Sequence, residues 1–339
     1  MKRIDFVLSA LLLPGFLISP RNEERLVFEP REGSSLEKQA EFEIEGRLTR
    51  FKLDEYELGP LSVPTVKLLT SAKFTDKFER VGNGRPLEYV RRFGEISGKW
   101  ESEGRREDIP GFFALSASSV RFEWDSKRKE YTIRREEGAC SLIPLDKLIE
   151  DMDLRGLLPD KAVANGTEWT VQGRSLTDAL FGGTEMGLIG VTRDQLLETM
   201  VRDVLLRPFR ELAERQTQLR CKYIESFEPE ETRFATVSLR HADRYWLDLT
   251  EPVNQCLNVQ GYGWNTTRWK VRDFFLRWKV DCEGNMIWNV TEGHFESLEF
   301  EAKVELEITF AFLGRDPPMK IEIDAEGTGR WHMKAEAKH

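Results

Sequence analysis

The sequence is poor in the residues that metal, redox and nucleophilic chemistry use most often. It has four histidines and four cysteines, and no two cysteines stand in the CxxC spacing of a structural zinc site. It contains no HExxH, Walker or GxGxxG motif, and Gly173-Arg174-Ser175 lacks the second glycine of a nucleophile elbow. We therefore expect no cofactor and no resident metal, and a non-enzymatic role is favoured over an enzyme.

Excess positive charge is also missing. The chain of 339 residues carries a formal net charge of -9, and its Arg and Lys residues are interspersed with Glu. Nucleic acid is not expected as a partner, because phosphate binding needs a basic surface. The composition is otherwise that of a folded globular protein, with 40% hydrophobic and 32% charged residues.

Long hydrophobic runs are absent except at the N-terminus. Lys2 and Arg3 precede an apolar stretch over residues 6–18, interrupted by Pro14, which is the layout of a secretory signal peptide. Residues 1–20 are therefore predicted to be a signal peptide or an uncleaved N-terminal anchor, with no transmembrane span after its removal. No cysteine follows the run, so we expect an exported protein of the periplasm or cell envelope that is not lipidated.

The most informative stretch is residues 297–312, SLEFEAKVELEITFAF. Apolar side chains stand at every even position from Leu298 to Phe312, and charged ones fill most odd positions between them. This period-2 alternation predicts a β-strand with one face buried and the other in water. Because the run is longer than a typical strand of about 5–6 residues, we expect a bend or a bulge, and we place it at the centre of a large antiparallel sheet.

Other segments repeat this alternation. Over residues 37–54 its phase slips before Phe51 and Leu53, which predicts a β-bulge. Residues 119–136 indicate a hairpin around a charged turn. Further strands are predicted at residues 66–80, 87–101, 168–171, 219–227, 232–239, 245–249, 269–282, 286–290, 319–325 and 329–335.

The middle of the chain has helical spacing instead. Residues 144–157 place Leu145, Leu148 and Met152 on one side, and a second apolar stripe begins at the N-cap Thr192 and meets Pro208. The predicted fold class is therefore α+β: a large curved antiparallel sheet, in one piece or as two related halves, with helices packed on one face. The predicted divisions are the leader at 1–20, an N-terminal β-rich half at 21–143, a helical middle segment with a short strand at 144–217, and a C-terminal antiparallel β half at 218–339.

Residues 158–169, LPDKAVANGTEW, carry the pattern LP-x3-V-x2-G-x2-W. In this pattern Gly166 permits a turn with positive φ before Trp169 enters the core. The segment resembles uncharacterised exported bacterial β-rich proteins, some of which are similar to the lipoprotein-carrier fold. The resemblance implies a curved antiparallel sheet with helices over its concave face and an envelope location, and it implies no catalytic residues. Thr167 stands where Asp is common, and the lipidated N-terminal cysteine of many such proteins is missing.

Tryptophan is concentrated in the second half of the chain. Trp264 and Tyr262 belong to the Gly- and Asn-rich stretch GYGWNTT, and Trp269 follows it. An exposed aromatic loop of this kind can contact lipids or glycans, and packing within a hairpin or core is the alternative. Trp264, Tyr262 and Trp269 are the candidate ligand-binding residues.

Two histidine–carboxylate pairs have a metal-like spacing. His241 stands two residues from Asp243, and His294 stands two residues from Glu292. On a strand such pairs share a face, but we interpret them as solvated polar residues of turns. An acidic cluster that suits a hard cation, and that we interpret as a solvated helix face, consists of Glu150, Asp151 and Asp153.

The four cysteines form an even set in a chain predicted to be exported. Three pairings are possible, and the sequence does not choose among them. We predict at least one disulfide in the second half, among Cys221, Cys256 and Cys282, with buried free thiols as the alternative.

These features predict a non-enzymatic exported module that binds a lipid, another lipophilic ligand or an envelope component. The alternatives are a hydrolase-like enzyme that uses acidic residues in the concavity of the sheet, and a purely structural interaction protein. An enzyme should bring titratable residues together in a pocket. A lipid binder should show an apolar cavity instead.

Overall fold

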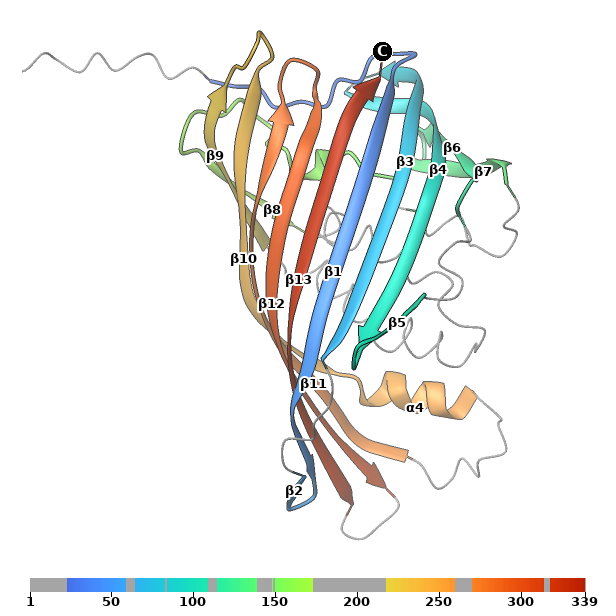
Figure 1. Cartoon of the computed structure of the whole chain (residues 1–339), viewed down its shortest axis with the longest axis vertical. Helices are drawn as coiled ribbons and strands as arrows, with labels where there is room; N and C mark the ends of the chain where they lie inside the picture. Colours follow the sequence, from blue (N-terminus) through green and yellow to red (C-terminus); the bar gives the residue numbers. More distant parts are fainter. Residues whose placement is uncertain are drawn as a thin grey trace, which may run out of the picture.

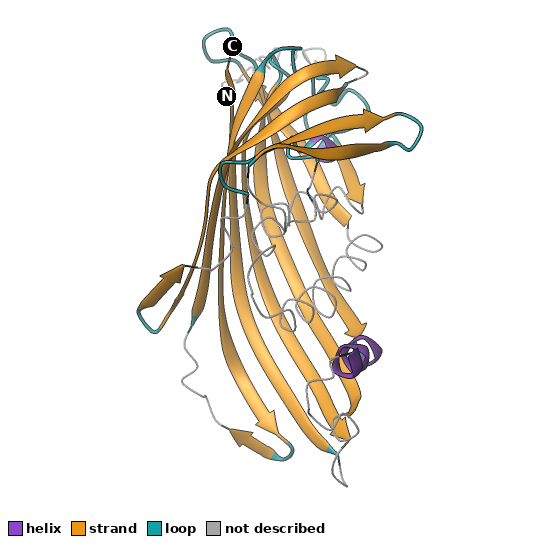
Figure 2. Cartoon of the chain, turned by 90° about the vertical axis from the view of Figure 1, so that its right-hand side faces the viewer, coloured by secondary structure: helices purple, strands orange, loops and turns teal. Residues whose placement is uncertain are grey.

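The computed structural model describes residues 23–58, 65–82, 84–108, 115–138, 148, 150–172, 218–259, 270–313 and 318–338. These residues form one large, strongly curved antiparallel sheet (Figures 1 and 2). Its N-terminal strands are β1 (Ser35–Leu53), β2 (Tyr56–Leu58), β3 (Val66–Gly82), β4 (Arg85–Ser102), β5 (Arg105–Asp108), β6 (Ser119–Asp125) and β7 (Glu130–Glu137). Its C-terminal strands are β8 (Glu168–Gln172), β9 (Gln218–Phe227), β10 (Phe234–Asp248), β11 (Lys270–Asn289), β12 (His294–Leu313) and β13 (Met319–Lys338).

The strand order places the two ends of the chain beside each other in the middle of the sheet. The order is β7-β6-β4-β3-β1-β13-β12-β11-β10-β9-β8, with β2 paired to β1 and β5 to β4. The first long strand therefore pairs with the last, from Ser35 opposite Lys338 to Leu53 opposite Ile321. The N-terminal and C-terminal strands share one continuous sheet.

β12 confirms the predicted alternation. It lies between β11 and β13, and its even residues Leu298, Phe300 and Ala302 are buried, whereas Glu301 and Glu305 are exposed. Pairing with β11 is irregular at two places, and the long strands in the middle of the sheet are bent in Figure 1. The bulge predicted in β1 is present as well, as a register shift between Leu48 and Arg50.

Three strands are longer than predicted. β10, β11 and β13 each run without a break through positions where two shorter strands were expected. Gly284 in β11 shows why glycine does not end a strand here. A Cβ at this position would lie 2.2 Å from the carbonyl oxygen of Glu299 and 2.8 Å from the ring of Phe300. Glycine therefore lets the opposite strand and its phenylalanine ring approach closely.

The predicted α+β class is wrong. Within the described residues the only helices are α4 (Thr250–Val259) and a single 3-10 turn, η2 (Arg155–Leu157), so the fold is almost entirely antiparallel β. The helix predicted at 144–157 is not formed where the chain is described: residues 150–154 are non-helical, and Leu154 has a φ of 57°. The helix predicted from Thr192, like the leader at 1–20, lies outside the described residues.

α4 was not predicted, and it is fastened to β11 by its polar side chains. The Asn254 carboxamide accepts a hydrogen bond from the Val271 amide at 3.0 Å and donates one to the Val271 carbonyl at 2.8 Å. The Thr250 hydroxyl accepts a hydrogen bond from the Phe274 amide at 2.9 Å. Pro252 stands in the first turn, where its missing N–H costs nothing.

The sheet has two distinct faces and two distinct ends. The inner face of the sheet is the face against which α4 and η2 pack, and both helices lie on that side of the sheet in Figure 2. The lower end is where β1 stops and β12 turns toward β13, and the upper end is the opposite one, which carries the C-terminus (Figure 1). The main core covers the upper part of the inner face.

Candidate functional site

The inner face carries apolar side chains in rows that cross the central strands. One row consists of Phe42, Trp331 and Phe300 on β1, β13 and β12, with ring centroids 4.7 and 5.6 Å apart along the row. Lower down, Leu306 stands between Trp278 of β11 and Ala325 of β13. The alternation of each strand thus merges into one apolar surface, because the registers place the inward-facing residues of neighbouring strands opposite one another.

Burial along this surface changes from the upper to the lower end. In the upper part the side chains are fully buried, for example Phe300 and Trp288. In the lower part α4 covers only a portion, through Leu249 and Val253 against Leu276. The half-buried apolar residues of this part of the inner face are Ile44, Leu48, Phe51, Leu53, Leu68, Phe274, Val280, Val304, Leu306, Ile308, Phe310, Phe312, Met319, Ile321 and Ile323. We call this set the lower inner face.

A polar pair interrupts the inner face at the boundary between its two parts. The hydroxyl oxygen of Tyr245 lies 3.0 Å from Nε2 of His241, and Nδ1 of His241 lies 2.9 Å from the carbonyl oxygen of Gln218. Both polar groups of the imidazole are satisfied when Nδ1–H donates to the Gln218 carbonyl and the Tyr245 hydroxyl donates to Nε2. Both side chains are buried.

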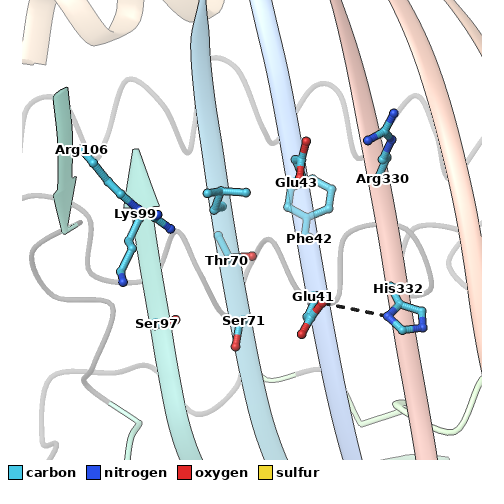
Figure 3. A pocket seen from close by; sticks show the side chains of 11 residues that line it. Glu41, Phe42, Glu43, Thr70, Ser71, Ser97, Lys99, Arg106, Arg330 and His332 are labelled. Carbon is cyan, nitrogen blue, oxygen red and sulfur yellow. Dashed lines mark ion pairs between the residues drawn. The ribbon is translucent and has the colours of Figure 1, made fainter. Parts of the chain in front are cut away.

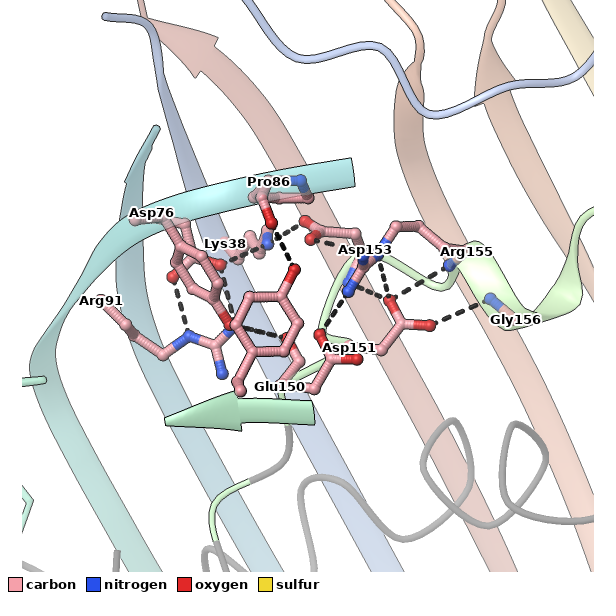
Figure 4. A network of polar contacts seen from close by, with 11 residues as sticks. Lys38, Asp76, Pro86, Arg91, Glu150, Asp151, Asp153, Arg155 and Gly156 are labelled. Carbon is pink, nitrogen blue, oxygen red and sulfur yellow. Dashed lines mark hydrogen bonds and ion pairs between the residues drawn. The ribbon is translucent and has the colours of Figure 1, made fainter. Parts of the chain in front are cut away.

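At the upper end a buried ionic network crosses the inner face (Figure 4). Asp76 of β3 accepts two hydrogen bonds from Arg91 of β4, at 2.7 and 2.8 Å, and one from Lys38 of β1 at 2.7 Å. All three side chains are almost completely inaccessible to solvent. A buried charge is costly unless it is paired and hydrogen-bonded, and each of these charges is.

The network continues into residues 150–157. Lys38 also forms an ion pair with Asp153, so that it joins two carboxylates. Arg155 forms an ion pair with Asp151 at 3.1 Å, and Asp151 accepts hydrogen bonds from the amides of Arg155 and Gly156 at 3.2 and 2.9 Å. The Lys38–Asp153 pair attaches the segment to the sheet, and the contacts of Asp151 hold the segment's own turn.

Aromatic hydroxyls and cations also reach the backbone of this segment. Tyr89 and Arg91 both donate to the carbonyl of Glu150, at 3.0 and 3.3 Å. Met152, Leu154 and Leu157 of the segment are buried in the main core. The upper end of the inner face is therefore closed by a segment held with both charge and apolar packing.

The carboxylates of the network have shifted pKa values of opposite sign. Burial favours the neutral form of Asp76, but the charges of Arg91 and Lys38 outweigh it and lower its pKa to about 2. For Asp153 burial prevails and raises the pKa, against the opposing effect of Lys38 and Arg155. Burial likewise raises the pKa of Glu150.

The acidic cluster was therefore misinterpreted. Asp151 and Asp153 do not lie on a solvated helix face, because Arg155 and Lys38 pair with them in the interior. The sequence held a signal that sequence reasoning missed. Lys38 and Asp76 occupy the inner-face parity of β1 and β3, where the neighbouring positions are apolar, and a charge at such a position requires a buried partner.

The outer face is charged and carries a groove of about 410 Å³ across β13, β1, β3 and β4 (Figure 3). Its charges are paired at the rim: Arg106 with Glu101 at 3.0 Å, and Arg330 with Glu301 at 3.2 Å. The lining residues are Glu41, Phe42, Glu43, Leu69, Thr70, Ser71, Ser97, Lys99, Arg106, Arg330 and His332. Cross-strand pairs of this kind keep the outer face hydrated.

The predicted ligand-binding residues Trp264, Tyr262 and Trp269 lie outside the described residues. Cys221 and Cys282 are buried free thiols, and burial raises the pKa of each to about 12. No disulfide joins Cys221 to Cys282 in this structure. The side chains of Cys140 and Cys256 lie outside the described part, and a disulfide in the protein stays a prediction.

The interpretation of His241 as a solvated turn residue is wrong, because it is buried within β10. His241 is buried whereas Asp243 is exposed. Nε2 of His294 lies 3.2 Å from the Glu292 carboxylate, and its Nδ1 lies 2.8 Å from the Phe295 carbonyl oxygen. No group of three His, Cys, Asp or Glu side chains that could hold a metal ion occurs in the described ranges.

The segment that carries the LP-x3-V-x2-G-x2-W pattern packs as expected from its residues. Gly166 has a φ of 82°, Val163 is buried, and the Trp169 indole donates to the Leu157 carbonyl at 2.9 Å. Trp169 packs half-buried against the main core. The pattern thus fastens the chain between η2 and β8.

Comparisons with known proteins identify no family. No protein-family model matches the chain, and no curated protein matches it. Among solved structures, a lipovitellin structure described for its lipid–protein interactions is similar at 10% identity and a TM-score of 0.33, over 91% of this chain. The match spans only 26% of the lipovitellin chain.

Two outer membrane proteins are also similar at very low identity. The outer membrane protein OprG from Pseudomonas aeruginosa matches with 7% identity and a TM-score of 0.21, over 92% of this chain and 99% of OprG. An outer membrane channel from Pseudomonas putida F1 matches with 5% identity and a TM-score of 0.19, over 94% and 100% of the two chains. No helix in the described part of the chain is long and apolar enough to cross a bilayer.

Proposed function

We propose that this chain is an exported, non-enzymatic envelope protein that binds the acyl chains of a lipid on its lower inner face. The observation that supports the proposal is the half-burial of a continuous apolar surface from Val304 to Phe312 and across the neighbouring strands. The signal-peptide pattern at residues 1–20 supports the location.

The lower inner face has a suitable length for an acyl chain. Val304 and Phe312 are eight positions apart on β12, which corresponds to about 26 Å at ~3.3 Å per residue. One leaflet of a bilayer has a hydrocarbon depth of about half of 30 Å. Each methylene transferred from water to this surface contributes roughly 0.8 kcal/mol.

The buried carboxylates argue against the hydrolase-like alternative. Asp76, Asp151 and Asp153 each form an ion pair with Lys38, Arg91 or Arg155. A general base must accept a proton from a bound substrate. These carboxylates are instead occupied by cations of the same chain.

Fluorescence titration with cis-parinaric acid tests the proposal directly. The probe should bind saturably to the full-length protein. Ile308→Gln, on the lower inner face, should weaken binding at least about tenfold, because it places an unpaired amide against the acyl chain. Thr309→Gln is the matched control on the opposite face of the same strand, and its binding should be unchanged.

Native mass spectrometry of protein purified from its own envelope fraction gives an independent readout. A co-purified species with the mass of a lipid is the expected result. Absence of both saturable probe binding and co-purified lipid would contradict the proposal and favour the purely structural interaction role.

A further inference from the structure

The lower end of the sheet presents apolar side chains to solvent. Tyr56, in the β1–β2 hairpin, is 75% exposed, and Leu313, the last residue of β12, is 42% exposed. Both β2 and the end of β12 lie at the bottom of Figure 1. The half-buried apolar residues of the inner face at the same end are Leu53, Phe310, Phe312, Met319 and Ile321.

The turn that carries Tyr56 is held rigidly. The Asp54 amide donates to the Lys320 carbonyl at 2.8 Å, and the Lys320 amide donates to the Asp54 carboxylate at 2.7 Å. Asp54 itself has a φ of 52°, a conformation that Asp adopts more readily than most residues. These two hydrogen bonds attach the turn to β13 and so keep Tyr56 at the lower end of the sheet.

Charges at this end neutralise one another. Arg50 lies 3.5 Å from both Glu57 and Glu322 and 3.4 Å from Asp324. Lys52 and Lys320 also pair with Glu322, so three cations stand against three carboxylates. The lower end therefore has little net attraction for either sign of charge, and contact with it must be driven by the apolar side chains.

We infer that the lower end docks on a lipid bilayer with electrically neutral headgroups, with Tyr56 and Leu313 inserted at the interface. Protruding hairpin ends can enter the boundary between headgroups and acyl chains, and a tyrosine suits it because its ring is apolar and its hydroxyl is polar. The paired charges beside them can remain among the headgroups. The bilayer would then meet the lower inner face directly, which gives a lipid a continuous apolar path. This last step rests on the proposed function, whereas docking itself does not.

Two exposed aromatic residues elsewhere define the limits of the docking surface. Trp246 pairs with Arg277, which lies seven positions above Lys270 at the start of β11. At ~3.3 Å per residue it stands about 23 Å from the tip, beyond the ~5–10 Å depth of interfacial insertion. Phe227 lies at the upper end of β9 and is 42% exposed, the same fraction as Leu313.

Flotation with phosphatidylcholine vesicles tests the docking. The wild-type protein should float with the vesicles, and the double variant Tyr56→Glu/Leu313→Glu should partition at least about tenfold less, because both apolar contacts are replaced by charge. Phe227→Glu introduces the same charge at equal exposure on the opposite end, and it should float like the wild type. All three proteins should bind cis-parinaric acid equally in solution, since the lower inner face is unchanged.

Each outcome separates docking from lipid binding. Vesicle binding by the double variant equal to that of the wild type would overturn the docking, as would binding that requires anionic lipid and is released by salt. A wild-type dimer that the double variant converts to a monomer, without vesicle binding, would assign this end to a second copy of the chain. Loss of probe binding with intact flotation would instead refute the proposed function and leave the docking supported.

Discussion

At the scale of single residues, the charges at inner-face positions have the largest consequences. Three charged residues occupy buried positions whose neighbours form the apolar core: Lys38, Asp76 and Arg91. Their contacts with one another offset the cost of burying the charges. Arg91 also lies over the rings of Phe74 and Phe122, each 5.1 Å from its centroid. The network is thus part of the packing as well as of the electrostatics.

Removal of one carboxylate from the network should be strongly destabilising. Asp76→Asn leaves Lys38 and Arg91 buried without their shared partner, and we expect a loss of about 3–5 kcal/mol in the free energy of unfolding. The same substitution in the surface pair with Arg50, Asp324→Asn, should cost at most about 1 kcal/mol. Urea denaturation of both variants measures the difference. Equal losses would show that the buried network contributes no more than a surface pair.

The pH dependence of stability should report the same carboxylate. The pKa of Asp76 falls from an ordinary 3.8 to about 2 on folding. Its contribution is therefore fully present above pH 4 and is lost as the pH falls toward 2. The loss amounts to about 2 kcal/mol, because a tenfold change in proton affinity corresponds to ~1.36 kcal/mol. Asp153 and Glu150, whose pKa values are raised, protonate earlier in the titration and oppose this loss.

Unfolding measured between pH 5 and pH 2 should show this decline in the wild type and a shallower one in Asp76→Asn. The shallower slope is expected because Asn has no proton to bind. Parallel profiles would mean that other carboxylates cause the acid sensitivity.

At the scale of elements, β12 shows how a strand's two faces differ in their tolerance of change. Phe300 is buried in the main core, while Glu301 and Glu305 face solvent, Glu305 beside Lys279. Each face makes its own contacts, because successive side chains point to opposite sides.

Substitutions on β12 should therefore alternate in severity. Phe300→Asp should abolish soluble expression, because it places an unpaired charge in the core, and Leu306→Asp should be destabilising but milder, since Leu306 is only half-buried. Glu301→Gln and Glu305→Gln should change the free energy of unfolding by no more than about 0.5 kcal/mol. Similar unfolding midpoints for the two classes would contradict the assignment of the faces.

At the scale of the whole molecule, the β1–β13 ladder joins the two ends of the chain. The ladder extends along the full length of β1, and the ionic network also connects residues 38–91 with residues 150–155. The predicted β-rich halves at 21–143 and 218–339 thus contact each other through backbone hydrogen bonds, and buried charge ties the first half to the middle segment.

Separate expression of residues 21–143 and 144–339 tests this dependence. Each fragment alone would expose a long unpaired edge, so we expect both to aggregate. Co-expression should restore a soluble complex, detected by co-purification on a tag carried by one fragment. A Phe42→Pro fragment is the control, because proline removes a backbone donor in β1 and should prevent the rescue. A fragment that is soluble and folded alone would show that the halves are independent.

The sequence by itself determined the strands and their two faces. Alternation between apolar and charged residues is a local property with a period of two, so β1, β12 and the hairpin of β6 and β7 follow from it, including the bulge between Leu48 and Arg50. The turn at Gly166 follows equally from one residue's backbone freedom.

Only the tertiary structure decided what lies opposite each face. Helical spacing at 144–157 was overruled because Asp153 pairs with Lys38 on the distant strand β1. Asp151 instead accepts hydrogen bonds from the amides of Arg155 and Gly156 in a non-helical turn. The pairing of β1 with β13 and the contacts of α4 with Val271 likewise join residues remote in sequence. Such contacts depend on which strands become neighbours, and no local periodicity encodes that order.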